Sequence, residues 1–498
     1  MNDPTNIASP EKREEVYNAC GFSIQQSTSL LEELLANKKA LKRVPITKEE
    51  DILNPVVDFC IFLNYVMIEI SSIVRAYVRA EILAEKQYHL KFVNWIILES
   101  YKYLYGYGKS VNTSLWEKNI EPLLSFIKDP QLIADFEAIK TQIIKFRDSN
   151  ITNKNFRDIS IHYDLDPLLI YEMLTGLNEE DETQRALAFL PLLFELFSFT
   201  NKYFHLFLRD NIVNKRFPQD VPLDLYTRTS TNNFSTDKVS ELNELINQNK
   251  KNLDRLVRQQ KWMQKLVVEE QEKDKASLET ILLTLPILKV HSFIDILIID
   301  LASAKRAFFL AEYPIEKNVF LKRINAIIYE GFKKLYGLNN NDNTYWNSYI
   351  LQVENKIKSN ASENLSNQLN LKLNMLRPTI KDLGKQRHLS IHLDEGVEEI
   401  YEMLVNLKPE AEFQKQEDFF KTIMQMLIQS IEILKFIEKQ SEEKSKKSRF
   451  VTIQKAKNIL ELLANSPDFP GKEKTIKLIQ QIISGEFYDN IMNNKSGK

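Results

Sequence analysis

An internal duplication constrains the fold of this chain more than any other feature of its sequence. Residues 157–162 (Arg-Asp-Ile-Ser-Ile-His) recur as residues 387–392 (Arg-His-Leu-Ser-Ile-His), at an offset of 230. In both copies an Arg precedes a His by five positions, and a Ser-Ile pair fills the same places. The tetrapeptide Tyr-Glu-Met-Leu follows each copy at the same offset. A polar signature was therefore duplicated together with the scaffold that carries it.

The duplication extends upstream of the signature. Matched residues at an offset of 231 include Arg75 and Arg306, Glu81 and Glu312, Glu99 and Glu330, and the Leu-Tyr-Gly tripeptides at 104–106 and 335–337. Trp116 and Trp346 return the offset to 230, which indicates one single-residue insertion or deletion after the tripeptide. The Gly that closes each tripeptide is predicted to end a helix.

The scaffold is predicted to be all-α. Only 11 Gly occur in 498 residues, and apolar residues recur at spacings of three and four almost throughout. We expect two pseudo-equivalent helical-bundle repeats and a C-terminal helical extension. The predicted bounds are 1–209 for the first domain, 210–236 for a linker, 237–440 for the second domain and 441–498 for the extension.

Several helices are predicted from apolar periodicity and end signals. They cover residues 10–41, 56–84, 122–147, 168–177, 186–208, 238–275, 287–311, 401–407, 419–437 and 452–492. Asp166 followed by Pro167 is a strong helix start, because Asp caps the first turn and Pro needs no N–H donor there.

Composition points to an ordinary globular chain in a reducing compartment. Hydrophobic residues make up 43% and the net charge is −2, so bulk charge favours no polyanionic partner, although a local basic groove could still bind phosphate. The two cysteines, Cys20 and Cys60, predict neither a disulfide framework nor a zinc site. We expect no signal peptide, no membrane span in apolar stretches such as 187–199, no cofactor and no metal, and a cytoplasmic location.

The duplicated signature suits phosphate chemistry. Arg supplies a permanently charged planar donor, and His can accept or donate a proton near neutral pH. Together they suffice to cleave RNA by attack of a ribose 2′-hydroxyl on its own phosphate. In a regular helix, residues five apart point about 140° away from one another. We therefore expect the signature to begin in a loop or cap, or the second copy to supply the missing half.

An all-helical domain that bears this signature resembles the HEPN superfamily, whose motif is Arg, four to six residues, then His, with Asn, Asp or His favoured after the Arg. Asp158 and His388 fit that preference. The resemblance implies a metal-independent endoribonuclease, with Arg157 and His162 meeting Arg387 and His392 in one composite cleft between two domains. It further implies single-stranded RNA or tRNA as substrate, a role in antiviral defence or as a regulated toxin, and control by a regulatory protein or an activating ligand.

Other readings of the signature remain open. The repeats could form a noncatalytic platform that binds RNA or protein, or an antitoxin-like inhibitor of a partner enzyme, and the Arg and His could be structural. The matched Glu99 and Glu330 could orient the arginines or form ion pairs on a helix face. The sequence leaves open whether the intramolecular pseudo-dimer assembles further.

Overall fold

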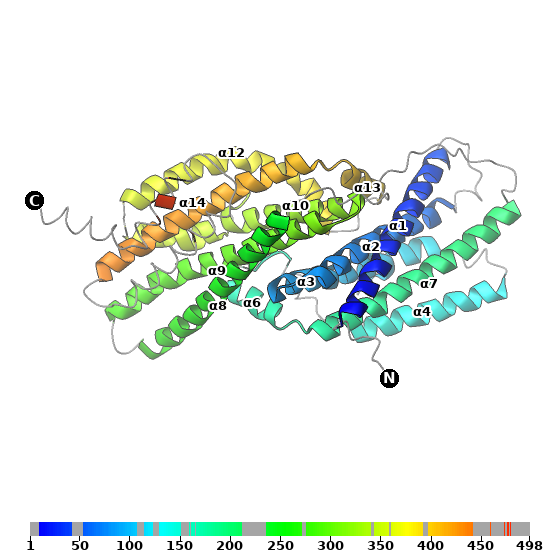
Figure 1. Cartoon of the computed structure of the whole chain (residues 1–498), viewed down its shortest axis with the longest axis horizontal. Coiled ribbons are helices and arrows are strands. Elements are labelled where there is room, and N and C mark those ends of the chain that lie inside the picture. Colours follow the sequence, from blue (N-terminus) through cyan, green and yellow to red (C-terminus); the bar gives the residue numbers. More distant parts are fainter. Residues whose placement is uncertain are drawn as a thin grey trace, which may run out of the picture.

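The computed structural model of the chain is helical wherever it describes the residues (Figure 1). It describes residues 9–41, 53–106, 114–122, 129–150, 159, 161–164, 166–211, 236–270, 275–339, 343–357, 360–391, 397–441, 459, 473, 476–477 and 479. No strand occurs within these ranges, so the predicted all-α class is confirmed.

The helices recur in similar order and length along the chain. Those of the first half are α1 (Pro10–Leu41), α2 (Leu53–Arg79), α3 (Leu83–Tyr105), the π-helical turn η3 (Trp116–Ile120), α4 (Pro130–Asn150), α6 (Pro167–Thr175) and α7 (Glu179–Asn211). Those of the second half are α8 (Thr236–Glu270), α9 (Lys275–Leu310), α10 (Pro314–Tyr336), the π-helical turn η5 (Trp346–Ile350), α11 (Leu351–Ile357), α12 (Asn360–Ile391), α13 (Val397–Val405) and α14 (Pro409–Ser441).

Some predicted helix ends are confirmed and others are wrong. Gly106 and Gly337 end α3 and α10 with φ of 77° and 76°, and the Asp166 side chain caps α6 by accepting from the Leu168 N–H at 3.2 Å. The single helix predicted over 56–84 is instead broken at residues 80–82, between α2 and α3. The helix predicted from residue 122 begins at Pro130, and the one predicted from 287 begins at Lys275. Most of the predicted linker and C-terminal extension lies outside the described residues.

The two halves form an elongated molecule in which each half contributes one short helix to the other (Figure 1). From the first half, α6 packs on α8, where the Tyr171 hydroxyl donates to Asp254 at 2.8 Å. From the second half, α13 packs beside α1 and α2, where the Tyr401 hydroxyl donates to Glu32 at 3.2 Å. The halves therefore hold each other through equivalent elements.

Matched arginines cross the boundary between the halves in opposite directions. The contacts are Arg75 with Glu312 and Glu316, both at 2.7 Å, and Arg306 with Glu85 at 2.8 Å and Glu81 at 3.3 Å. Because all three kinds of residue are matched at an offset of 231, the two sets of contacts are reciprocal. Reciprocity of this kind is the mark of a twofold interface, in which the same patch appears on both sides.

A second reciprocal cluster lies deeper in the boundary. Its ion pairs are Lys91 with Asp300, and Lys322 with Glu69, with Arg323 as a further partner of Glu69. All five side chains are almost fully excluded from solvent. Burial lowers the pKa of Lys322 to about 8, while Glu69 opposes that shift. Buried charges of this kind need their partners, so the cluster fixes how the halves meet.

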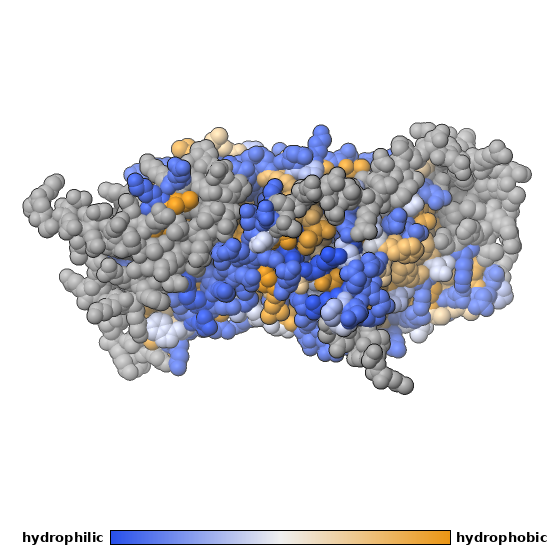
Figure 2. All heavy atoms as spheres, in the orientation of Figure 1, coloured by the Kyte–Doolittle hydropathy of each residue, from blue (hydrophilic) through white to orange (hydrophobic). Residues whose placement is uncertain are grey.

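Two of the described helices have the length and composition of a membrane span, although the sequence analysis expected none. Asn54–Arg79 and Leu278–Leu310 have the length and hydropathy to cross a membrane. In the apolar windows, 94% and 67% of the residues are buried inside the protein, as in the core helices of many globular proteins. On the face in Figure 2, hydrophilic residues gather over the middle of the molecule, and a hydrophobic patch lies over α1 and α7.

Candidate functional site

Arg387 lies four residues before the end of α12. Because α12 continues through Ile391, the second copy does not begin in a loop or cap, and the other expected condition, completion by the first copy, is the one that remains for Arg387. A helical Arg387 points well away from the direction of a residue five positions later. Within a continuous helix, an Arg and a His five positions apart would therefore not converge on one phosphate. His392 and the side chain of His388 lie outside the described residues.

His162 of the first half is the histidine that meets Arg387. Nη2 of Arg387 lies 3.2 Å from Nδ1 of His162, although 225 residues separate the two in sequence. Arg157 and Asp158 lie outside the described residues. Of the four predicted catalytic residues, the structure thus places one from each half in direct contact.

Glu330 of α10 completes the site. Its carboxylate accepts hydrogen bonds from Nε and Nη2 of Arg387, and lies 3.4 Å from Nδ1 of His162. Burial alone would raise the pKa of Glu330, but the hydrogen bond from His162 and the charge of Arg387 outweigh it and lower the pKa. The carboxylate therefore stays ionised. This geometry fits both sequence readings of Glu330, since the carboxylate forms an ion pair with Arg387 and also holds the direction of its side chain.

The second half holds His162 in place through the residue that follows it. Tyr163 has a φ of 51°, which a bulky residue rarely adopts, and its side chain is buried. Its hydroxyl donates to Asp300 of α9 at 2.6 Å, and its ring packs edge-on against Phe293. The backbone carbonyl of Asp164 also accepts from the Tyr345 hydroxyl at 3.2 Å. The His162 turn is thus shaped by contacts to the other half.

The contacts of Nδ1 fit both roles of a proton-transfer histidine. When Nδ1 carries the proton it can donate to Glu330, and Nε2 is then a base. In the imidazolium both nitrogens carry protons, so Nδ1 still donates to Glu330 and Nε2–H is the acid. The side chains of Arg387 and His162 are 14% and 22% exposed, so both can be reached from solvent. Among the described residues, the hydrogen bonds of Arg387 use Nε and Nη2, and its guanidinium lies over the ring of Tyr329 at 5.6 Å.

Sequence reasoning missed Tyr163, Asp300 and Tyr345 as supports of the site. Tyr163 carried no signal because the corresponding second-half residue is Leu393. Asp300 is matched by Glu69 at the offset of 231, and that acidic match is the signal that could have found it. Among the residues that the structure describes, no group of three His, Cys, Asp or Glu is placed to hold a metal ion.

Comparisons with known proteins returned no match: no protein-family model, no curated protein and no solved structure resembles the chain closely enough to report. The family resemblance therefore rests on the duplicated motif and its helical context.

Proposed function

We propose that the chain is a metal-independent endoribonuclease of the HEPN type, with a composite site between two HEPN-like domains. The observation that carries the proposal is the contact between Arg387 of one half and His162 of the other. Reciprocal ion pairs across the boundary support the view of the halves as two pseudo-equivalent domains. We further propose an RNA substrate such as tRNA and a role in defence or as a regulated toxin.

The proposed reaction is a transesterification. The ribose 2′-oxygen bonds to phosphorus and gives its proton to a base, while the bond from phosphorus to the 5′-oxygen breaks and that oxygen takes a proton from an acid. We assign one of these proton transfers to His162. Arg387 is assigned the role of stabilising the negative charge that develops on the phosphate oxygens. Glu330 is a positioning residue, because it contacts both side chains and fixes their orientation. The products are a 2′,3′-cyclic phosphate and a 5′-hydroxyl.

A noncatalytic role is the second candidate, because one specific observation favours it. Glu330 is almost fully buried and already neutralises Arg387, as in a structural ion pair. In that case the repeats would form a platform for RNA or a partner protein. RNA binding without cutting would distinguish this role from catalysis.

The test incubates purified full-length protein with labelled single-stranded RNA and tRNA in EDTA. Wild type is compared with the double variants Arg157→Ala/His162→Ala and Arg387→Ala/His392→Ala. Arg377→Ala is the control, since Arg377 is an arginine ten residues earlier on α12. We expect cutting by wild type and the control, with cyclic phosphate ends, and loss of cutting in both double variants. Equal cutting by all proteins, or none with any RNA, would contradict the proposal.

A further inference from the structure

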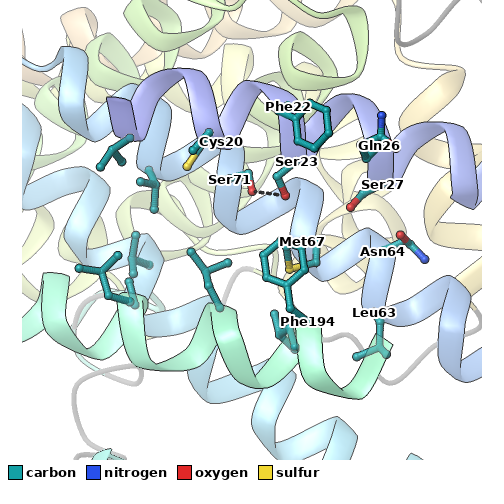
Figure 3. Close-up of a pocket in the computed structure, with 18 of the residues that line it drawn as sticks. Cys20, Phe22, Ser23, Gln26, Ser27, Leu63, Asn64, Met67, Ser71 and Phe194 are labelled. Atoms are coloured by element: carbon teal, nitrogen blue, oxygen red, sulfur yellow. Dashed lines mark hydrogen bonds between the residues drawn. The ribbon is translucent and has the colours of Figure 1, made fainter. Parts of the chain in front are cut away.

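A cavity of about 540 Å³ lies in the first half between α1, α2, α3 and α7. In Figure 3, side chains from α1 and α7 approach it from opposite sides, with α2 behind. Leu63, Met67 and Leu193 line it and are buried, whereas Phe22 and Phe194 are more than half exposed. Protein interiors seldom contain voids much larger than a water molecule, and small-molecule sites measure about 300 to 1,000 Å³. The cavity therefore has the size of a ligand site.

The matched region of the second half carries charges instead. The offset of 231 pairs Val74 with Lys305. When α7 and α14 are aligned at their first residues, Leu187 pairs with Glu417. For α1 and α8, the alignment comes from Glu32 and Asp254, which accept hydrogen bonds from the matched tyrosines Tyr401 and Tyr171. The same alignment pairs Val16 with Lys238. Burial, reinforced by Lys238 and opposed by Glu417, lowers the pKa of Lys305, so these three side chains act on one another. Three charged positions of one half are thus apolar lining residues in the other.

Three neutral polar side chains of the cavity, Gln26, Ser27 and Asn64, lie near one another at one end (Figure 3). Ser71 donates to Ser23 at 3.2 Å further along the cavity, and the remaining polar lining residues are Tyr77, Glu182 and Thr183. Among the described lining residues none is Lys, Arg or His. Neutral donors and acceptors can bind a hydroxyl, ester or amide, but an anionic head would lose its hydration without gaining a cationic partner.

We propose that this cavity binds an uncharged amphipathic molecule, with an alkyl chain along α2 and a hydroxyl, ester or amide head at Ser27 and Asn64. The site is separate from the Arg387 and His162 contact, and the inference stands whether or not the chain cleaves RNA. The size of the cavity and the neutral polar side chains at one end of it together favour a small molecule over a helix from a partner.

The test uses the full chain with 1-decanol as the neutral probe and decanoate as the anionic one. Calorimetric titration and the shift in melting temperature report binding, since a ligand that binds only the folded state raises that temperature. Ala186→Phe fills the cavity from α7, and Ala138→Phe adds the same ring on the exposed face of α4 as a control. Leu187→Glu places in the cavity lining the residue type of its second-half match, Glu417. It replaces Ala186→Phe in the test if that variant does not fold.

We expect wild type and Ala138→Phe to bind 1-decanol at least tenfold more tightly than decanoate. Ala186→Phe or Leu187→Glu should weaken 1-decanol binding at least tenfold. Ser27→Ala should weaken it about threefold to tenfold through loss of one hydrogen bond. No binding by wild type, equal binding by the cavity variants, or equal binding of the two probes would overturn the proposal. Self-association lost in Ala186→Phe, without 1-decanol binding by wild type, would show a protein interface instead.

Discussion

Two of the places where the halves meet use charged residues in different ways. In the deep cluster, Glu69, Lys322 and Arg323 have side chains that are at most 1% exposed. At the candidate site, Arg387 and His162 are 14% and 22% exposed, and only Glu330 is comparably buried. A charge sealed between the halves can only hold them together. A partly exposed charge that is held by a buried partner can also bind a substrate.

The largest effect on stability is expected in the deep cluster. Glu69→Ala leaves Lys322 and Arg323 buried without their shared carboxylate, and breaking a buried pair costs about 3 to 5 kcal/mol. The free energy of unfolding in urea should fall by that amount. A fall below about 1 kcal/mol would show that the cluster is not what joins the halves.

Matched substitutions test whether the boundary is reciprocal. Arg75→Ala and Arg306→Ala each leave two glutamates of the other half without their arginine. Each variant should lose about 3 kcal/mol or more, because both arginines are buried. Arg75→Ala should lose more, because Arg75 also lies over the ring of Tyr17 and because Glu81, one partner of Arg306, is 68% exposed. Urea unfolding of both variants decides this, and a large loss in one with none in the other would argue against equivalent halves.

Tyr163→Phe tests whether the hydrogen bond from Tyr163 to Asp300 supports the site without being part of it. The variant keeps the ring but removes the hydroxyl that donates to Asp300, a hydrogen bond to a charged group worth about 1.5 to 3 kcal/mol. We expect a loss of stability of that size and weaker RNA cleavage, because the turn that presents His162 is loosened. Unchanged cleavage at unchanged stability would mean that Asp300 does not hold the turn.

The smallest effect is a pH dependence from Glu330. Its folded pKa is lowered below the ordinary value of 4.5, so its contribution to stability is present above about pH 4.5 and is lost as the pH falls through the folded pKa. Glu330→Gln removes that contribution. Wild type should therefore be the more stable protein at pH 7, and the gap should narrow as the pH falls below about 4.5. A gap that widens in acid would contradict the lowered pKa.

Local features of the fold were predictable from sequence, and contacts between the halves were not. The span of α1, the stops at Gly106 and Gly337 and the cap at Asp166 follow from signals within a few residues. The break before α3 was missed because Leu83 carries no end signal, whereas its match in the second half is Pro314, at the start of α10.

The site was predictable only in outline. The duplication placed Arg387 and His162 in equivalent signatures and implied that one copy completes the other. Sequence could not show that α12 remains helical through Ile391, nor that Arg387 contacts His162 of the other half. Arg75 and its glutamates were each matched with their repeats, but 237 residues separate Arg75 from Glu312 and nothing local pairs them.

The most direct test of the central claim is a double-mutant cycle in RNA cleavage. His162→Ala, Arg387→Ala and the combined variant are compared with wild type in kcat/KM, with urea unfolding as a check on folding. If the two side chains act as one unit on one phosphate, each single variant should lose about 10² to 10⁴-fold, and the combined variant little more. Losses that multiply in the combined variant would show that the two residues act independently and would contradict a shared site.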